Sequence, residues 1–225
     1  MKFRMALAGL ALIAAPLAVV AAKDWNAVQS VSPKGHKVGN PDAKAKLIQF
    51  VSYTCIHCAH FEQASDAPLR AGFIMEGKTE VEVRHVIRNP IDLAAALSTE
   101  CGKPTNFFAN HRAMMFTHDS WMAKAQAANK AQQNRWFTGT LGSRMQAIAG
   151  DLGFYAIMEK RGVDRVALDR CLADEAKARL ITANAQANSA EFGYTGTPSF
   201  ALNGKLLDNV HDWPSLQVAL TAAAQ

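Results

Sequence analysis

The sequence has few charged and aromatic residues, and it contains no internal repeat or low-complexity tract. Charged residues account for 19% and aromatic residues for 8% of its 225 positions, whereas 49% of the positions are hydrophobic. This balance is typical of globular proteins and excludes the disordered and fibrous classes. A formal charge of +5 is too small to indicate binding to nucleic acid.

Long hydrophobic runs are absent after residue 22. Before that point, Lys2 and Arg4 precede an apolar stretch that ends in a small-residue cleavage pattern at Ala22. We therefore predict a cleaved signal peptide over residues 1–22 and export of a chain that begins at Lys23. The alternative is a retained membrane anchor, because the uncharged run approaches the length of the shortest membrane span.

Residues 47–90 show the pattern of a strand, a helix and a second strand. Residues 47–51 are almost all apolar, which is typical of a buried central strand. A helical pattern follows from Cys55 to about Arg70, where Pro68 is expected to strain or end the helix. Apolar and polar residues then alternate, so we expect a second strand that runs parallel to the first after a right-handed connection.

The rest of the chain shows a helical stretch and a closing hairpin. Residues 91–191 lack strand patterns and carry apolar residues at helical spacing, with Asp151 and Asp164 as expected helix N-caps. The pair Asn203-Gly204 then predicts a tight hairpin between two short strands. Asp212 and Pro214 mark the start of a final helix.

These patterns predict an α/β fold in which a small mixed sheet is interrupted by an inserted helical domain. Residues 23–90 and 192–225 are expected to form the domain that contains the sheet, and residues 91–191 the insertion. Ahead of the first predicted strand, the residues around Gly39 are expected only to form a polar turn.

Cysteine is scarce, with four residues, and two of them are separated only by Ile56 and His57. Cys55 and Cys58 lie where the first predicted strand gives way to the helix, so the N–H groups and dipole of the helix N-terminus can stabilise a Cys55 thiolate. His57 adds a donor or a positive charge beside it. We predict Cys55 as the attacking thiol and Cys58, one turn along, as the resolving thiol.

Two other uses of this cysteine pair are open. A purely structural disulfide could join Cys55 and Cys58. Zinc could bind the pair together with neighbouring histidines, although zinc sites favour a second cysteine pair at short spacing, and Cys101 and Cys171 lie far apart. We therefore predict neither a metal nor a cofactor.

Two segments in combination resemble the DsbA family of bacterial disulfide oxidoreductases. Residues 50–62, which contain the dithiol, are similar to the active-site region of that family. Residues 193–200, followed by Asn203 and Gly204, are similar to the loop and hairpin that the family places opposite its active site. The resemblance extends over nearly all of the chain after the predicted signal peptide, and it implies a thioredoxin fold with a large inserted helical domain.

The resemblance also implies roles for residues outside the dithiol. Pro198 corresponds to a cis-proline beside the two cysteines, although most X-Pro bonds are trans, and Thr197 to a residue whose backbone pairs with bound substrate. Glu62 corresponds to a buried acid that assists proton movement to Cys58; a solvated carboxylate is the alternative. Ile56, expected to contact substrate, departs from the proline of well-known oxidases and the glycine frequent in isomerases, which leaves the redox potential open.

The remaining cysteines, Cys101 and Cys171, lie on apolar faces of predicted helices. In an oxidising compartment we expect them to form a structural disulfide with each other. Two buried free thiols and a secondary redox pair are the alternatives. His85 lies in the apolar phase of its strand and is expected to be a hydrogen-bonded core residue without a catalytic role.

The predicted function is oxidation of cysteine pairs in unfolded or reduced exported proteins in the periplasm, and the resemblance implies re-oxidation by a membrane quinone-linked partner. A disulfide isomerase or reductase is the enzymatic alternative. No sizeable dimerisation segment lies between Lys23 and Leu47, whereas isomerases commonly use one, so we expect a monomer and favour an oxidase over an isomerase. A periplasmic chaperone or binding module of the same fold, with an incidental dithiol, is the alternative from a different class.

Overall fold

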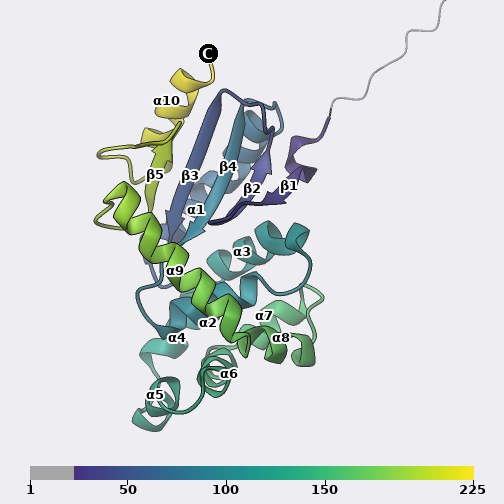
Figure 1. Cartoon of the computed structure of the whole chain (residues 1–225), viewed down its shortest axis with the longest axis vertical. Coiled ribbons are helices and arrows are strands. Elements are labelled where there is room, and N and C mark those ends of the chain that lie inside the picture. The colour runs from purple at the N-terminus through teal and green to yellow at the C-terminus, as the bar shows by residue number, and fades with distance from the viewer. Residues whose placement is uncertain (1–22) are drawn as a thin grey trace, which may run out of the picture.

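The computed structural model describes residues 23–225, so the predicted signal peptide lies outside the described residues. A mixed sheet forms the upper part of the molecule and a group of helices lies below it (Figure 1). The strand order is β1-β2-β4-β3-β5-β6. The strands are β1 (Gln29–Val31), β2 (His36–Gly39), β3 (Ala45–Val51), β4 (Thr79–His85), β5 (Ser199–Leu202) and β6 (Lys205–Leu206). The predicted α/β class is therefore confirmed.

The two strands predicted to be parallel, β3 and β4, form the centre of the sheet, with Leu47 opposite Val81. Strand β5 pairs antiparallel with β3, and β6 completes the hairpin with β5. Asn203 and Gly204, with φ of 51° and 81°, provide the left-handed conformation that a two-residue hairpin needs. This hairpin carries the chain back beside the strand that leads to Cys55.

Strands β1 and β2 lie where the sequence predicted only a polar turn. Strand β2 is antiparallel to β4, and β1 is antiparallel to β2 at the edge of the sheet. Both strands are short, so they lack the alternation of apolar residues by which a strand is recognised in a sequence. Pairing with β2 on one edge and β3 on the other makes β4 an inner strand, and its Glu82 is 6% exposed and pairs with Arg84 at 3.0 Å.

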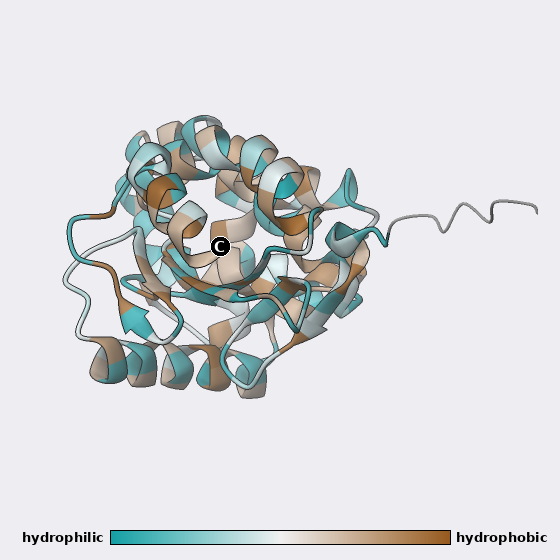
Figure 2. Ribbon diagram, turned by 90° about the horizontal axis from the view of Figure 1, so that it is seen from above, coloured by the Kyte–Doolittle hydropathy of each residue, from teal (hydrophilic) through white to brown (hydrophobic). Residues whose placement is uncertain are grey.

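Helices flank the sheet on both sides when it is seen from above (Figure 2). On one face, α1 (Ile56–Leu69) packs Phe61 against Phe200, with ring centroids 4.7 Å apart, and α10 (Trp213–Ala223) joins the same buried cluster. On the other face, Phe192 at the end of α9 (Glu175–Phe192) contacts Phe50, with centroids 4.9 Å apart. The strand that precedes Cys55 is therefore held from both sides.

Helix α1 does not end at Pro68, which lies inside it. The chain continues after Leu69 into a π-helical turn, Arg70–Ile74, in which the Met75 amide donates to the Arg70 carbonyl at 2.9 Å. Proline lacks a backbone N–H and crowds the turn that precedes it, yet the helix continues through Pro68 to Leu69.

The helices between β4 and β5 form the lower part of the molecule (Figure 1). They are α2 (Pro90–Thr99), α3 (Phe107–Phe116), α4 (His118–Gln126), α5 (Lys130–Phe137), α6 (Leu141–Leu152), α7 (Phe154–Glu159), α8 (Arg165–Leu172) and α9. No helix in residues 23–225 is both long and apolar enough to cross a membrane. The division into a sheet domain and an insertion stays a prediction.

The two expected N-caps in this region have different outcomes. Asp164 caps α8 and accepts a hydrogen bond from the Ala167 amide at 2.8 Å, as predicted. The prediction for Asp151 is wrong, because this residue lies near the end of α6, where it accepts a hydrogen bond from Trp136 Nε1 at 2.7 Å. The apolar spacing after Asp151 belongs to a second helix that begins beyond Gly153, whose φ is 85°.

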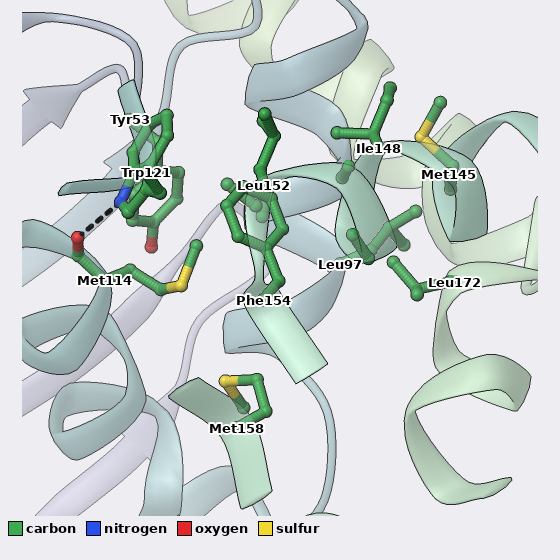
Figure 3. Packing of buried hydrophobic residues seen from close by; sticks show 14 of the residues in the cluster. Tyr53, Leu97, Met114, Trp121, Met145, Ile148, Leu152, Phe154, Met158 and Leu172 are labelled. Atoms are coloured by element: carbon green, nitrogen blue, oxygen red, sulfur yellow. Dashed lines mark hydrogen bonds between the residues drawn. The ribbon is translucent and has the colours of Figure 1, made fainter. Parts of the chain in front are cut away.

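A hydrophobic core fills the space between the lower helices (Figure 3). Trp121, which is 1% exposed, donates from Nε1 to the Met114 carbonyl at 3.0 Å and packs edge-on against Phe154. Four methionines are wholly buried in this core: Met114, Met115, Met145 and Met158. The core includes Tyr53, Cys55 and Cys58, so the start of α1 is packed directly onto the helical part of the molecule.

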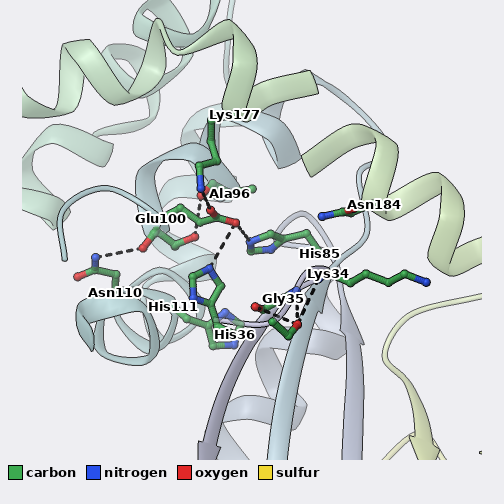
Figure 4. A network of polar contacts seen from close by, with 12 residues as sticks. Lys34, Gly35, His36, His85, Ala96, Glu100, Asn110, His111, Lys177 and Asn184 are labelled. Carbon is green, nitrogen blue, oxygen red and sulfur yellow. Dashed lines mark hydrogen bonds and ion pairs between the residues drawn. The ribbon is translucent and has the colours of Figure 1, made fainter. Parts of the chain in front are cut away.

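A buried polar cluster joins the sheet to the helices (Figure 4). Glu100, which follows α2, lies 3.5 Å from His36 of β2, 3.2 Å from His85 of β4 and 2.9 Å from Lys177 of α9. Burial lowers the pKa of His85, while hydrogen bonds from the two histidines hold the pKa of Glu100 well below its usual range against the opposing effect of burial. His85 is thus a buried, partnered residue, which agrees with the sequence analysis.

Candidate active site

Cys55 is the N-cap residue of α1 and follows β3 after the short turn Ser52–Thr54. Its backbone is extended, with φ of −92° and ψ of 113°, and its carbonyl accepts hydrogen bonds from the amides of Cys58 and Ala59 at 3.1 and 3.2 Å. A buried strand that ends one turn before an amphipathic helix therefore brings Cys55 to the helix N-terminus. The two thiols are free, and Cys55 is 6% exposed whereas Cys58 is 1% exposed.

The surroundings of Cys55 favour its thiolate. A hydrogen bond from the Cys58 thiol, together with bonds from the Thr197 side chain and from the backbone N–H groups of Cys58 and His57, lowers the pKa of Cys55 to about 4, although burial opposes this. At neutral pH Cys55 is therefore a thiolate, the form that acts as nucleophile and as leaving group in thiol–disulfide exchange.

Cys58 has the opposite properties. Burial raises its pKa well above the usual value, and the hydrogen bond and negative charge of Cys55 raise it further. Cys58 therefore holds its proton while Cys55 loses one. The sequence predicted an exposed attacking thiol at Cys55, but the structure leaves only 6% of this residue exposed, so the two thiols differ in pKa more than in exposure.

The Thr197–Pro198 peptide bond is cis, and the loop that contains it lies against Cys55. The Cys55 thiol donates to the Thr197 carbonyl at 3.1 Å. Thr197 Oγ1 is buried and has no hydrogen-bond partner among residues 23–225, so it is free to donate to the sulfur once Cys55 has lost its proton. The pairing of Phe50 with Ser199 in the sheet sets this loop beside the start of α1.

His211 is a residue of this region that the sequence analysis missed. Its Nδ1 lies 3.2 Å from the Pro198 carbonyl, so the loop before α10 supports the proline loop from behind. A histidine between a hairpin and a helix start gives no signal in a sequence, because the contact depends on how the hairpin folds back.

Ile56 and His57 occupy the exposed edge of the site. Ile56 is 46% exposed and borders a hollow that Thr54, Met122 and His118 also line. Its position is suited to contact with a polypeptide bound at Cys55. His57 is exposed as well, and its contribution to Cys55 comes through its backbone N–H group.

Glu62 lies one turn beyond Cys58 on α1, with 14% of its side chain exposed. It borders a cavity of about 100 Å³ between α1, α3 and the sheet, which Ser65 and Gln49 also line. His111 of α3 places Nε2 3.6 Å from the Glu62 carboxylate, and its Nδ1 lies 2.9 Å from the Tyr53 hydroxyl. His111 could not be identified from the sequence, because nothing in the helical pattern shows that α3 packs onto α1.

Cys101 and Cys171 are joined by a disulfide, with a Cα–Cα distance of 5.6 Å. Cys101 follows α2, and Cys171 lies on α8, so the bond ties two helices together across 70 residues of sequence. The structure therefore separates the four cysteines into one reduced pair at the start of α1 and one oxidised pair among the lower helices. Within residues 23–225, no three histidine, cysteine or acidic side chains are grouped so that they could hold a metal ion.

A parallel strand–helix–strand unit with an antiparallel hairpin, a dithiol at the helix start and a cis-proline loop beside it define a thioredoxin-like class of protein. The thioredoxin family model matches residues 31–222. The chain therefore belongs to the thioredoxin family. A solved structure of a protein-disulfide isomerase from Novosphingobium aromaticivorans shares 44% sequence identity and a TM-score of 0.81, over 85% of this chain and 98% of that one.

Other solved structures extend the likeness to the DsbA form of the fold. Wolbachia pipientis alpha-DsbA1 matches with a TM-score of 0.65 and 19% identity, over 84% of this chain and 89% of that one. BdbD from Bacillus subtilis matches with a TM-score of 0.61 and 17% identity, over 90% and 99% of the two chains. The predicted thioredoxin fold with a helical insertion and the predicted likeness to DsbA proteins are confirmed.

A curated relative has a name of the same kind. A Rickettsia bellii protein named "Putative protein-disulfide oxidoreductase" is 26% identical over 172 residues, which are 76% of this chain and 58% of that protein. The chain thus spans less than two thirds of the length of this relative.

Proposed function

We propose that the protein is a thiol:disulfide oxidoreductase that introduces disulfide bonds into exported proteins. The observation that carries the proposal is the asymmetry of the dithiol: the pKa of Cys55 is lowered to about 4, and the pKa of Cys58 is raised. A stabilised Cys55 thiolate stabilises the reduced enzyme, and the disulfide form is correspondingly a strong oxidant.

The proposed reaction proceeds in two exchanges. A substrate thiolate attacks Sγ of Cys55 in the Cys55–Cys58 disulfide, a mixed disulfide forms, and Cys58 leaves and takes up a proton. A second substrate thiolate then attacks the substrate sulfur of the mixed disulfide, and Cys55 leaves as a thiolate. The substrate loses two electrons as its disulfide forms, and the enzyme gains them as the dithiol. A leaving thiol of low pKa departs faster, so Cys55 suits the second step.

Other residues have proposed roles in these exchanges. Thr197 would align a substrate strand through its backbone beside Pro198, and Ile56 would contact the residue next to the substrate cysteine. Glu62 would exchange a proton with Cys58. This role is supported by its place one turn beyond Cys58, beside a cavity that Ser65 and Gln49 also line.

The equilibrium of Cys55 and Cys58 with glutathione buffers, measured by mass after alkylation, tests the proposed direction. We expect a potential near about −120 mV, as for strong oxidants, and a value near about −270 mV would instead identify a reductant. Activity against a reduced protein should require Cys55. If a variant without Cys55 and Cys58 still kept unfolded clients in solution, while the wild type failed to oxidise them, a chaperone or binding function would replace this proposal.

Disulfide isomerase is the second candidate, and one observation favours it. The Novosphingobium aromaticivorans relative, at 44% identity, is named a protein-disulfide isomerase. An isomerase would restore activity to a substrate protein with wrongly paired disulfides when supplied in its reduced form, whereas an oxidase would act only on the reduced substrate. Comparison of the two substrates under one glutathione buffer separates the functions.

The setting of the reaction is also a proposal. We place the protein in the periplasm as a monomer, with reduced exported proteins as substrates and a membrane quinone-linked partner that re-oxidises Cys55 and Cys58. Fractionation of cells, followed by alkylation of the two thiols with and without quinone depletion, tests location and partner together. Accumulation of the reduced form only when quinone is depleted is the expected result.

A further inference from the structure

Asp92 is a wholly buried carboxylate beside the turn that leads to Cys55. It lies in the first turn of α2 and is 0% exposed. Its Oδ1 accepts hydrogen bonds from the Ser52 hydroxyl and from the Thr54 backbone N–H, each at 2.8 Å. Both donors belong to the three residues between β3 and Cys55. A buried charge is costly unless hydrogen bonds satisfy it, so these contacts fix the turn to α2.

The other oxygen of Asp92 is bonded to the segment between β4 and α2. Oδ2 accepts from the Arg88 backbone N–H at 3.0 Å, and the Arg88 guanidinium lies 3.8 Å away. Arg88 and Asn89 also donate to the Thr54 hydroxyl, at 3.0 and 3.1 Å. Asn89 in turn caps α2 through the amides of Ile91 and Asp92. The junction between β4 and α2 therefore clamps the turn on its side chains and on its backbone.

The clamped turn determines where the start of α1 points. The Cys55 amide donates to the Ser52 carbonyl at 3.3 Å, so the orientation of Ser52 is passed on to Cys55. The Cys55 sulfur depends on the N–H groups of the next residues, which favour charge only when they are directed at it beforehand. Rotation of the turn would move the sulfur away from these donors without breaking any contact of the helix itself.

We propose that Asp92 is a positioning residue for Cys55, which clamps Ser52–Thr54 against the start of α2 and so holds the reactive sulfur among its hydrogen-bond donors. The inference rests on the proposed thiol–disulfide exchange. Asp92 touches neither the sulfur nor a substrate, and it acts only through the turn.

Asp92 could instead act simply as a charge, and the two roles predict opposite effects. A carboxylate near a thiolate repels it, so removal of the charge alone would stabilise the thiolate and lower the pKa of Cys55. Loss of the clamp would let the sulfur drift from its donors and raise that pKa. The direction of the change therefore identifies the role.

The variant Asp92→Asn provides the test. In an amide an NH₂ group replaces one of the two acceptor oxygens, so the side chain cannot accept from the turn on one side and from the Arg88 amide on the other. We expect the pH midpoint of Cys55 alkylation by iodoacetamide to rise from about 4 to about 5, and the rate at pH 5 to fall about twofold, because about half of the sulfur would then be protonated at that pH. An unchanged or lower midpoint would overturn the proposal.

Ser52→Ala carries the same test with less risk to folding, because it removes one donor and leaves the carboxylate paired with Thr54 and Arg88. A smaller rise in the same direction is expected, and no rise would contradict the clamp.

Asp151→Asn is the matched control. Asp151 also holds donors from neighbouring elements, Trp136 Nε1 at 2.7 Å and Arg135 Nε at 3.0 Å, but within the lower helices. The substitution Asp151→Asn should lower the melting temperature without moving the pH midpoint of Cys55 alkylation.

The same measurements distinguish a failure of the positioning role of Asp92 from a failure of the proposed function. Alkylation of Cys55 reports the state of the sulfur and needs no substrate. If the midpoint rises in Asp92→Asn while the wild type fails to oxidise substrate dithiols, the proposed function is wrong and the clamp stands. If the wild type oxidises dithiols and the midpoint does not rise, the clamp is wrong and the function stands.

Discussion

The chain contains two cysteine pairs whose surroundings differ in almost every respect. Cys55 and Cys58 are adjacent in space because they share the first turn of α1, and both are free thiols. Cys101 and Cys171 come from separate helices and are joined across 70 residues. The first pair faces a cis-proline loop and helix N–H groups, whereas Cys101 is buried among apolar side chains of the lower helices.

This difference shows how one chemical group serves two purposes in one molecule. A short loop between two cysteines constrains the unfolded chain little, so the Cys55–Cys58 bond adds little stability through that constraint. A long loop restricts the unfolded chain much more, so the Cys101–Cys171 bond adds stability through that constraint. Reactivity and stabilisation are therefore properties of the two sites, and each can be removed separately.

The largest effect should come from Cys55→Ala. This change removes the only thiol in residues 23–225 whose pKa is lowered, so oxidation of substrate dithiols should fall to the uncatalysed rate. The rate of disulfide formation in a reduced peptide substrate is the measurement. The Cys101–Cys171 bond should stay intact in this variant, which mass spectrometry without reductant checks. Retained turnover would show that Cys55 is not the reactive thiol and that the roles of the two cysteine pairs are not separate.

Removal of the other pair should have the opposite result. Cys101→Ala combined with Cys171→Ala should lower the free energy of unfolding by about 4 kcal/mol, the value expected for a loop of this length, while turnover per folded molecule stays unchanged. Chemical denaturation of the oxidised proteins measures the stability. If turnover per folded molecule also fell, the Cys101–Cys171 bond would be needed for the geometry of the active site, and the two cysteine pairs would not be independent.

Thr197→Val sharpens the contrast by weakening one donor of the reactive site. The Thr197 side chain helps to lower the pKa of Cys55, and its hydroxyl has no other partner among the described residues. Valine keeps the branched shape and removes the donor, so the pKa of Cys55 should rise by about one, a value suited to one hydrogen bond to a charged group, and alkylation at pH 5 should slow about twofold. Ser199→Ala, which loses a bond to the Gly196 carbonyl in the same loop, is the control and should leave the midpoint unchanged.

Much of the architecture could be predicted from the sequence because it depends on local patterns. The apolar run of β3, the Asn203-Gly204 hairpin and the caps Asp164 and Asp212 each result from neighbouring residues. Strands β1 and β2 could not be predicted, since their short polar sequences become strands only by pairing with β4. Asp151 was misplaced because apolar spacing does not reveal a helix break at Gly153.

The candidate site shows the same limit. The dithiol, Thr197 and Pro198 carry motifs, so residues far apart in the chain could be associated through a family resemblance. Asp92, His111 and His211 carry none, because each acts through a contact between elements that the fold brings together. A sequence therefore reveals the residues that react more easily than it reveals the residues that position them.

Acid should affect the polar cluster around Glu100 and the reactive site at Cys55 in different ways, and this is the smallest effect that we expect. Burial lowers the pKa of His85, so the folded state resists protonation there. The unfolded state binds that proton first, and stability should decrease as the pH falls through about 6.5, the ordinary value for histidine. The pKa of Glu100 is also lowered, so its contribution is present above about 4.5 and is lost below it.

The oxidised protein is the right sample for this measurement, because Cys55 does not titrate in a disulfide. Between pH 7.5 and 5.5 we expect unfolding to become easier by about 1 kcal/mol, and His85→Gln should reduce that pH dependence. Cys55 in the reduced protein should remain a thiolate over the same range, since its pKa is about 4. Mild acid would then weaken the junction around Glu100 while the sulfur of Cys55 keeps its charge. A pH dependence identical in His85→Gln and wild type would place the acid sensitivity elsewhere in the molecule.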